Sequence, residues 1–244
     1  MSNRNPVFTD KVLEGVVVGN EAPMTIQGTL NKVMILAAIM MLAGGAAWYE
    51  FSLGFMDKVN LIMIVGAVVG LISGFVVSFK PTLAPTLSPV YAFAEGAFLG
   101  GISAIFEHTY KGIVLQAVSM TFVAVFVMAM LYKAGVIKAT EKFKSTVITA
   151  TMSVLVFYLI MWVLSFFHIS VPMMYDSSLL GVGLSIFLVI LASLNLIIDF
   201  DFVEQGAGRF LPKYYEWYGA FGLMVTIVWL YVEVLRLLSR LRER

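Results

Sequence analysis

Cysteine is absent from the 244-residue chain, so disulfide bonds, thiolate metal sites and cysteine nucleophiles are excluded. Charge is also scarce. Asp, Glu, Lys and Arg make up 13% of the residues, whereas soluble domains carry roughly a quarter. The formal net charge of +1 gives no indication of nucleic-acid binding, and 60% of the residues are hydrophobic. This composition predicts a protein whose partner is the lipid bilayer.

The sequence signatures of common catalytic and nucleotide-binding sites are missing as well. The chain contains no Gly-x-Ser-x-Gly, no His-Glu-x-x-His, no Walker-type glycine loop and no dinucleotide fingerprint. Its two histidines, His108 and His168, are isolated at the expected ends of apolar stretches. We therefore expect no enzymatic activity and no cofactor.

Long uncharged stretches dominate the chain instead. A membrane helix needs roughly 20 mostly apolar residues, and seven candidate stretches lie between short islands of charge. They cover residues 33–49, 59–79, 87–106, 112–132, 145–167, 177–198 and 217–238. We predict an all-α membrane protein with seven transmembrane helices, residues 32–244, preceded by a cytoplasmic segment, residues 1–31. The alternative has six spans and a re-entrant last segment.

The lysines and arginines of the short loops predict the orientation. With seven spans, most of them lie on the side of the amino terminus, which the positive-inside rule places in the cytoplasm. The basic carboxyl-terminal tail, which includes Arg240, argues the other way. The residues on the amino-terminal side are Arg4, Lys11, Lys32, Lys80, Lys133, Lys138, Lys142, Lys144, Arg209 and Lys213.

Ionisable groups inside an apolar stretch are costly to bury, so each is a candidate functional residue. Glu95 lies near the middle of the third stretch. Its carboxyl group must be protonated, paired or next to water, which makes it a candidate proton-sensitive group. The structural alternative is a protonated side chain that hydrogen-bonds to a neighbouring helix.

Further acids lie at the end of the sixth stretch and within the seventh. Asp199 and Asp201 follow the sixth stretch directly, where a membrane boundary would also explain them. Glu233 has Arg236 and Arg240 three and seven positions further on, on the same helical face. Either this is a local ion pair at the membrane surface, or Glu233 belongs to an ion path and is held by an arginine latch.

Five segments together resemble the Bax inhibitor family, also called the transmembrane Bax-inhibitor-motif family, and within it the bacterial branch. The segments are NPVF, MTIQGTLNK, YAFAEGAFLGGIS, LNLIIDFDFVEQG and EWYGAFGLMVTIVWLYVEVLRLL. The resemblance implies six helices around a central seventh, a pH-sensitive calcium leak and a place in the bacterial plasma (inner) membrane.

The resemblance also implies a hydrogen-bonded acidic pair that senses pH. Its first member matches Asp199, with Asp201 as a close alternative, and its second matches Glu233, where the family usually has aspartate. Helix geometry opposes this pairing. Glu233 follows Glu216 by seventeen residues, about 25 Å along a helix, and Asp199 should lie near Glu216. The two acids can meet only if the sixth helix is longer than its apolar stretch. Otherwise Glu95 is the better partner.

Two functions follow from these patterns. The first is a leak pathway for cations, with Ca²⁺ or H⁺ as the transported ion, formed by a monomer. Carboxylates are hard oxygen ligands that suit Ca²⁺. The second, which the resemblance implies, is a regulator without transport activity that binds a membrane protein, such as a membrane-bound protease, through residues 1–31.

Overall fold

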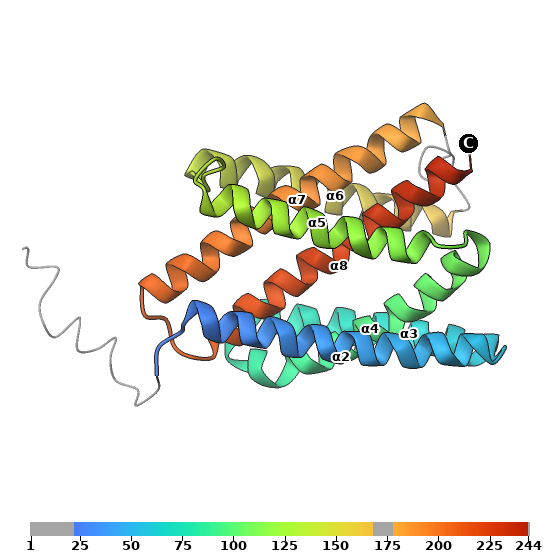
Figure 1. The fold of residues 1–244 in the computed structure, drawn as a ribbon, viewed down its shortest axis with the longest axis horizontal. Coiled ribbons are helices and arrows are strands. Elements are labelled where there is room, and N and C mark those ends of the chain that lie inside the picture. The colour runs from blue at the N-terminus through green and yellow to red at the C-terminus, as the bar shows by residue number, and fades with distance from the viewer. Residues whose placement is uncertain (1–21, 168–177, 244) are drawn as a thin grey trace, which may run out of the picture.

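The computed structural model describes residues 22–167 and 178–243, and this part of the chain is helical. Residues 1–21 of the predicted cytoplasmic segment, and His168, lie outside it. Figure 1 shows the arrangement of the helices. They are α2 (Ile26–Ser52), α3 (Met56–Phe79), the 3₁₀ turn η1 (Pro81–Leu83), α4 (Ala84–Thr109), α5 (Ile113–Lys133), α6 (Glu141–Phe166), α7 (Leu179–Gly208) and α8 (Tyr215–Arg242).

Local sequence accounts for where several helices begin. Thr25, Thr140 and Ser178 each accept a hydrogen bond from a backbone N–H in the first turn of α2, α6 and α7, respectively. Such side chains satisfy donors that the helix itself leaves unpaired. Because Thr25 caps α2, this helix begins at Ile26, six residues before the predicted domain boundary at residue 32.

The described residues contain seven helices that are long and apolar enough to cross a membrane. The chain is therefore an integral membrane protein, and the predicted all-α fold is confirmed. The last segment is one continuous helix of 28 residues. The alternative with a re-entrant last segment is therefore wrong.

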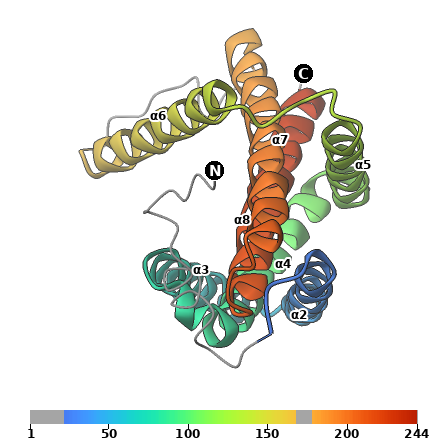
Figure 2. The same cartoon turned by 90° about the vertical axis from the view of Figure 1, so that its left-hand side faces the viewer.

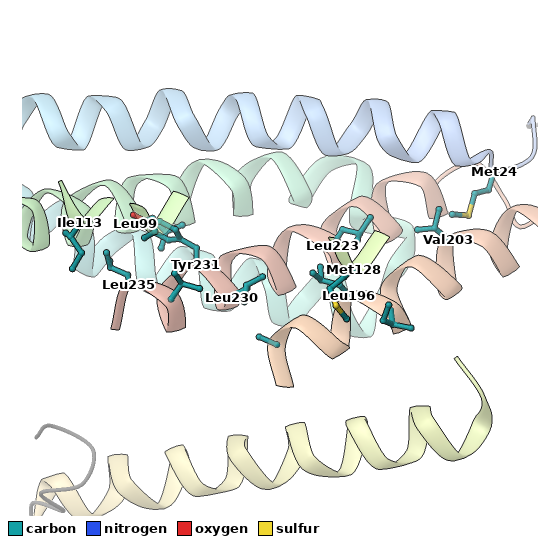
Figure 3. Close-up of a cluster of buried hydrophobic side chains, with 14 residues drawn as sticks. Met24, Leu99, Ile113, Met128, Leu196, Val203, Leu223, Leu230, Tyr231 and Leu235 are labelled. Carbon is teal, nitrogen blue, oxygen red and sulfur yellow. The ribbon is translucent and has the colours of Figure 1, made fainter. Parts of the chain in front are cut away.

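Helix α8 lies at the centre of the bundle, with the other six helices around it (Figure 2). The most apolar 18-residue stretch of α8 is 61% buried, the highest value among the seven helices, whereas that of α6 is 6% buried. Buried side chains follow α8 from the Met24 end of the bundle to the Ile113 end (Figure 3). Central packing explains why α8 tolerates polar residues that a lipid-facing helix would not.

Helices α2 and α4 pack with their backbones in close contact. A Cβ atom at Gly96 would collide with the backbone of Met40, and one at Gly100 with the backbone of Gly44. Small residues allow this approach between membrane helices. Gly96 and Gly100, four residues apart on α4, therefore mark a helix–helix contact.

Candidate functional site

Asp199 of α7 faces the central helix with one carboxylate oxygen unpaired. Its Oδ2 atom is buried and has no hydrogen-bond partner among the described residues. The Thr226 side chain of α8 hydrogen-bonds to this carboxylate. A Cβ atom at Gly222, one turn earlier, would lie 3.8 Å from Oδ1. The carboxylate thus lies against a part of α8 that carries one small polar side chain and no bulky one.

Glu233 is buried in the same helix but is fully engaged. Its side chain is 2% exposed. Tyr158 of α6 donates a hydrogen bond of 3.1 Å to Oε1, and Arg236 Nη1 lies 3.3 Å from both carboxylate oxygens. Arg236 also donates to the Tyr158 hydroxyl at 2.8 Å. An arginine and a tyrosine therefore neutralise and orient Glu233.

Asp199 and Glu233 do not hydrogen-bond to each other in this structure. Asp199 lies opposite Thr226, which precedes Glu233 by seven residues, or about 10 Å of helical rise. Seven residues are nearly two full turns, so Thr226 and Glu233 share one face of α8. Helix α7 does continue past the predicted end at residue 198, to Gly208. The longer helix brings Asp199 inward, yet the two acids remain at different depths.

Asp201 points away from both of these acids. Its Oδ2 accepts hydrogen bonds from Lys144 Nζ at 2.7 Å and from Gln205 Nε2 at 2.6 Å. The Tyr132 hydroxyl lies 3.3 Å from Oδ1 and also donates a short hydrogen bond to Glu204. Asp201 therefore belongs to a polar cluster that joins α5, α6 and α7, and its charge is balanced there.

Glu95 of α4 faces α3 and not α8. A Cβ atom at Gly70 of α3 would lie 3.1 Å from Glu95 Oε1, so this glycine makes room for the carboxyl group between the two helices. Within the described residues, Glu95 has no hydrogen bond or ion pair. It is half-buried and is not brought together with Glu233.

The two arginines of the expected latch have different partners. Arg236 contacts Glu233. Arg240 is 5% exposed and donates hydrogen bonds to the Gly181 carbonyl and, at 2.9 Å, to Ser185 Oγ, both on α7. One arginine therefore neutralises an acid, whereas the other holds the end of α8 to the beginning of α7.

Glu216 is a buried ion-pairing residue that was not among the candidate site residues predicted from the sequence. Its side chain is 2% exposed and lies 2.7 Å from Lys32 Nζ. Thr25 donates to the same carboxylate through its hydroxyl at 2.9 Å and its backbone N–H at 3.1 Å. Gly28 leaves the space that this carboxylate occupies. The signal was the spacing of Thr25, Gly28 and Lys32, which forms one small polar face at the beginning of α2.

The acids are too dispersed to form a metal site on their own. No group of three or more His, Cys, Asp or Glu side chains converges within residues 22–167 and 178–243.

Two cavities lie near these residues. One, of 330 Å³, is lined by Tyr132, Asp201 and Glu204 together with the α5–α6 connection. The other, of 410 Å³, has an apolar lining contributed by α2, α4, α5 and α8, and it contains none of the predicted site residues. The polar cavity is therefore next to the Asp201 cluster, and the larger cavity does not contact the acids.

Comparison with known proteins supports the family resemblance. The family model described as Bax inhibitor 1 like matches residues 5–243, which is nearly the whole chain. Neither the curated proteins nor the solved structures contain a match.

Proposed function

Because the chain belongs to the Bax inhibitor 1-like family, we propose that it is a pH-sensitive leak pathway for cations, with Ca²⁺ as the principal ion. The observation that carries this proposal is the unpaired, buried Oδ2 of Asp199 beside the central helix. A charged group inside a membrane bundle is expensive unless it serves transport, proton transfer or pairing. The Asp199 carboxylate lacks a cationic partner among the described residues, which leaves it available to a passing ion or a proton.

Asp199, beside α8, and Glu233, on α8, would act as two successive cation-binding positions. A cation attracted to the ionised Asp199 meets Glu233 two turns further on, once that carboxylate is released by Arg236. Protonation removes the charge of Asp199 and with it the attraction for the cation. Flux should therefore rise with pH across the range in which Asp199 loses its proton.

The test is Ca²⁺ entry into liposomes that contain purified protein and a Ca²⁺-sensitive dye, measured between pH 5 and 8. Asp199→Asn and Glu233→Gln each should lower the flux and flatten its dependence on pH. Asp57→Asn is the matched control, because Asp57 is an exposed acid in the first turn of α3. A flux that keeps its pH dependence in both site variants would contradict the proposal.

We propose further that the protein acts as a monomer in the bacterial plasma membrane, with its amino terminus in the cytoplasm and without catalytic activity. Support for this orientation comes from the connections between α3 and α4, α5 and α6, and α7 and α8. They carry Lys80, Lys138, Arg209 and Lys213, and Lys133 is the last residue of α5. Cytoplasmic loops are enriched in such residues.

A further inference from the structure

Helix α6 is the least embedded of the seven helices. Its most apolar stretch is 6% buried, below the 17% of α2, which is the next lowest. One face of α6 nevertheless carries polar residues at intervals of seven, among them Lys144, Thr151 and Tyr158. Seven residues are nearly two helical turns, so the three side chains lie in one line. We call them the polar row of α6.

Each member of the polar row contacts a polar side chain of α7 or α8. Lys144 Nζ lies 2.7 Å from Asp201 Oδ2. Asn195 Nδ2 donates to Thr151 Oγ1 at 2.9 Å. The third contact is the hydrogen bond from the Tyr158 hydroxyl to Glu233. The row thus attaches α6 to α7 at two levels and to α8 at a third.

This form of attachment is weak for a membrane helix. Lipid supplies no hydrophobic force that presses helices together, so association depends on close packing and interhelical hydrogen bonds. Within the described residues, the most apolar stretch of α6 has the least burial of the seven helices, so its attachment depends strongly on hydrogen bonds such as those of the polar row. Its removal from the bundle therefore costs less than the removal of a glycine-packed helix such as α2.

The polar row also lies next to both acids of the proposed ion path, Asp199 and Glu233. Asn195, the partner of Thr151, precedes Asp199 by one turn on the same face of α7. Tyr158 holds Glu233 directly. Displacement of α6 would free Asn195, one turn from Asp199, from Thr151 and would remove the tyrosine hydroxyl from Glu233.

We propose that α6 is the gate of the leak pathway, held closed by its polar row and opened by movement away from α7 and α8. This inference rests on the proposed cation leak. It assigns Lys144, Thr151 and Tyr158 as positioning residues of the closed state and not as ligands of the ion.

Loss of one contact in the row should increase the leak. Thr151→Val keeps the shape of the side chain but removes its hydroxyl, and we expect flux into liposomes to rise about threefold, the factor that corresponds to one average hydrogen bond between membrane helices. Thr146→Val is the matched control, because Thr146 is an exposed residue of α6 whose hydroxyl bonds within its own helix. Equal flux in both variants would contradict the gate.

A reversible lock tests the same idea in the opposite direction. The chain has no cysteine, so Thr151→Cys combined with Asn195→Cys places two unique thiols across the α6–α7 contact. A short bis-methanethiosulfonate reagent should bridge them and suppress flux, and dithiothreitol should restore it. The single variant Thr151→Cys has no second thiol to bridge, so its own flux should be the same before and after the reagent. Normal flux through the bridged protein would overturn the gate while leaving the leak function intact.

Spin-label distances test the movement without any measurement of flux. Labels at Leu155 of α6 and Phe122 of α5, both exposed, should give two distance populations in nanodiscs, of which the longer increases in Thr151→Val. A pair at Met41 of α2 and Phe122 is the control and should give one population. A single, unchanged distance for the first pair would overturn the gate, even if the protein shows no leak at all.

Discussion

At the scale of single residues, the buried acids of this bundle are in two different states. Glu216 and Glu233 have cationic partners, Lys32 and Arg236, within hydrogen-bonding range. Asp199 has a threonine neighbour and one oxygen that finds no hydrogen-bond partner in the described part of the chain. A paired acid holds helices together, whereas an unpaired one remains open to protons and cations. This difference distinguishes Asp199, the acid of the proposed leak pathway, from the ion-paired acids more clearly than their positions in the sequence.

The Lys32–Glu216 pair should contribute strongly to stability. Lys32→Met leaves a buried carboxylate without its cation, and breaking a buried pair in this way costs about 3–5 kcal/mol. Lys58→Met is the matched control, since Lys58 lies 3.7 Å from Glu50 in a largely exposed pair worth about 1 kcal/mol or less. Thermal unfolding in detergent should show a large loss for the first variant and little change for the second.

Removal of both charges should reverse much of that loss. In the double variant Lys32→Met and Glu216→Gln, no unpaired charge is left in the protein interior, and Thr25 can still donate to the glutamine carbonyl. We expect it to melt at a higher temperature than Lys32→Met alone. If the double variant is less stable than the single one, the carboxylate itself and not its pairing would be the stabilising element.

Arg236 should restrain Glu233, the second acid of the proposed ion path. Arg236→Gln leaves Glu233 with the Tyr158 hydroxyl but without a cation, so the carboxylate becomes available to Ca²⁺. The arginine side chain is 35% exposed, and release from a pair of this kind should raise neutral-pH flux about two- to fivefold. Liposome flux measures the change, and Arg209→Gln, on an exposed arginine, serves as the control. Unaltered or reduced flux would contradict the proposal that Arg236 restrains Glu233.

At the scale of helices, the bundle combines two kinds of contact. Helices α2 and α4 meet backbone to backbone through glycines, and their geometry leaves no space for an added methyl group. Helix α6 is held by the polar row and lies mostly outside the core. Close backbone packing favours a rigid α2–α4 pair, whereas a few polar contacts favour movement of α6. The proposed gate therefore differs from the α2–α4 pair in the kind of contact that holds it.

Glycine substitutions should distinguish the packed face of the α2–α4 pair from its free face. Gly96→Ala places a Cβ against the Met40 backbone, and overpacking of this kind costs about 1–3 kcal/mol. Gly45 has no atom within 4 Å of its added Cβ, so Gly45→Ala should stabilise its helix by about 0.5–1 kcal/mol. Thermal unfolding of both variants is the measurement. Equal effects would mean that α2 and α4 do not touch as described.

At the scale of the whole molecule, the continuous helix α8 decides on which side the chain ends. Its first turn contains Glu216, bound to Lys32 at the beginning of α2. Near its end, Arg242 donates hydrogen bonds to the Lys111 carbonyl and the Gln116 side chain at the α4–α5 connection. The two ends of α8 therefore belong to opposite ends of the bundle, as Figure 1 also shows.

Opposite sides can be distinguished by labelling, since the chain lacks cysteine. Lys213→Cys places a thiol in the α7–α8 connection, and Lys111→Cys places one in the α4–α5 connection. With the amino terminus in the cytoplasm, an impermeant maleimide should label the second in intact cells and the first only after permeabilisation. Labelling of both from one side would contradict seven crossings, and the reversed pattern would contradict the proposed orientation alone.

The helical fold was largely predictable from the linear pattern of charge. Mostly apolar stretches of membrane-spanning length can be located along the sequence without any structure. Each falls within an observed helix, apart from residues 112, 167 and 178, which lie just outside α5, α6 and α7, and residue 177, which is outside the described part. The candidate acids were also visible in this way, because a charged residue in an apolar stretch is conspicuous. Their partners were not. Tyr158 is 75 residues from Glu233, and Lys32 is 184 residues from Glu216.

What the sequence alone determined is therefore the membrane class, the seven helices and the short set of acids that are costly to bury. Only the tertiary structure decided which acid is paired, because pairing depends on the depth and rotation at which two helices meet. Asp199 of α7 meets α8 at Thr226, and two helical turns along α8 separate this contact from Glu233. Local residue preferences and apolar length do not encode such an offset, which arises from the packing of α7 and α6 against the central helix.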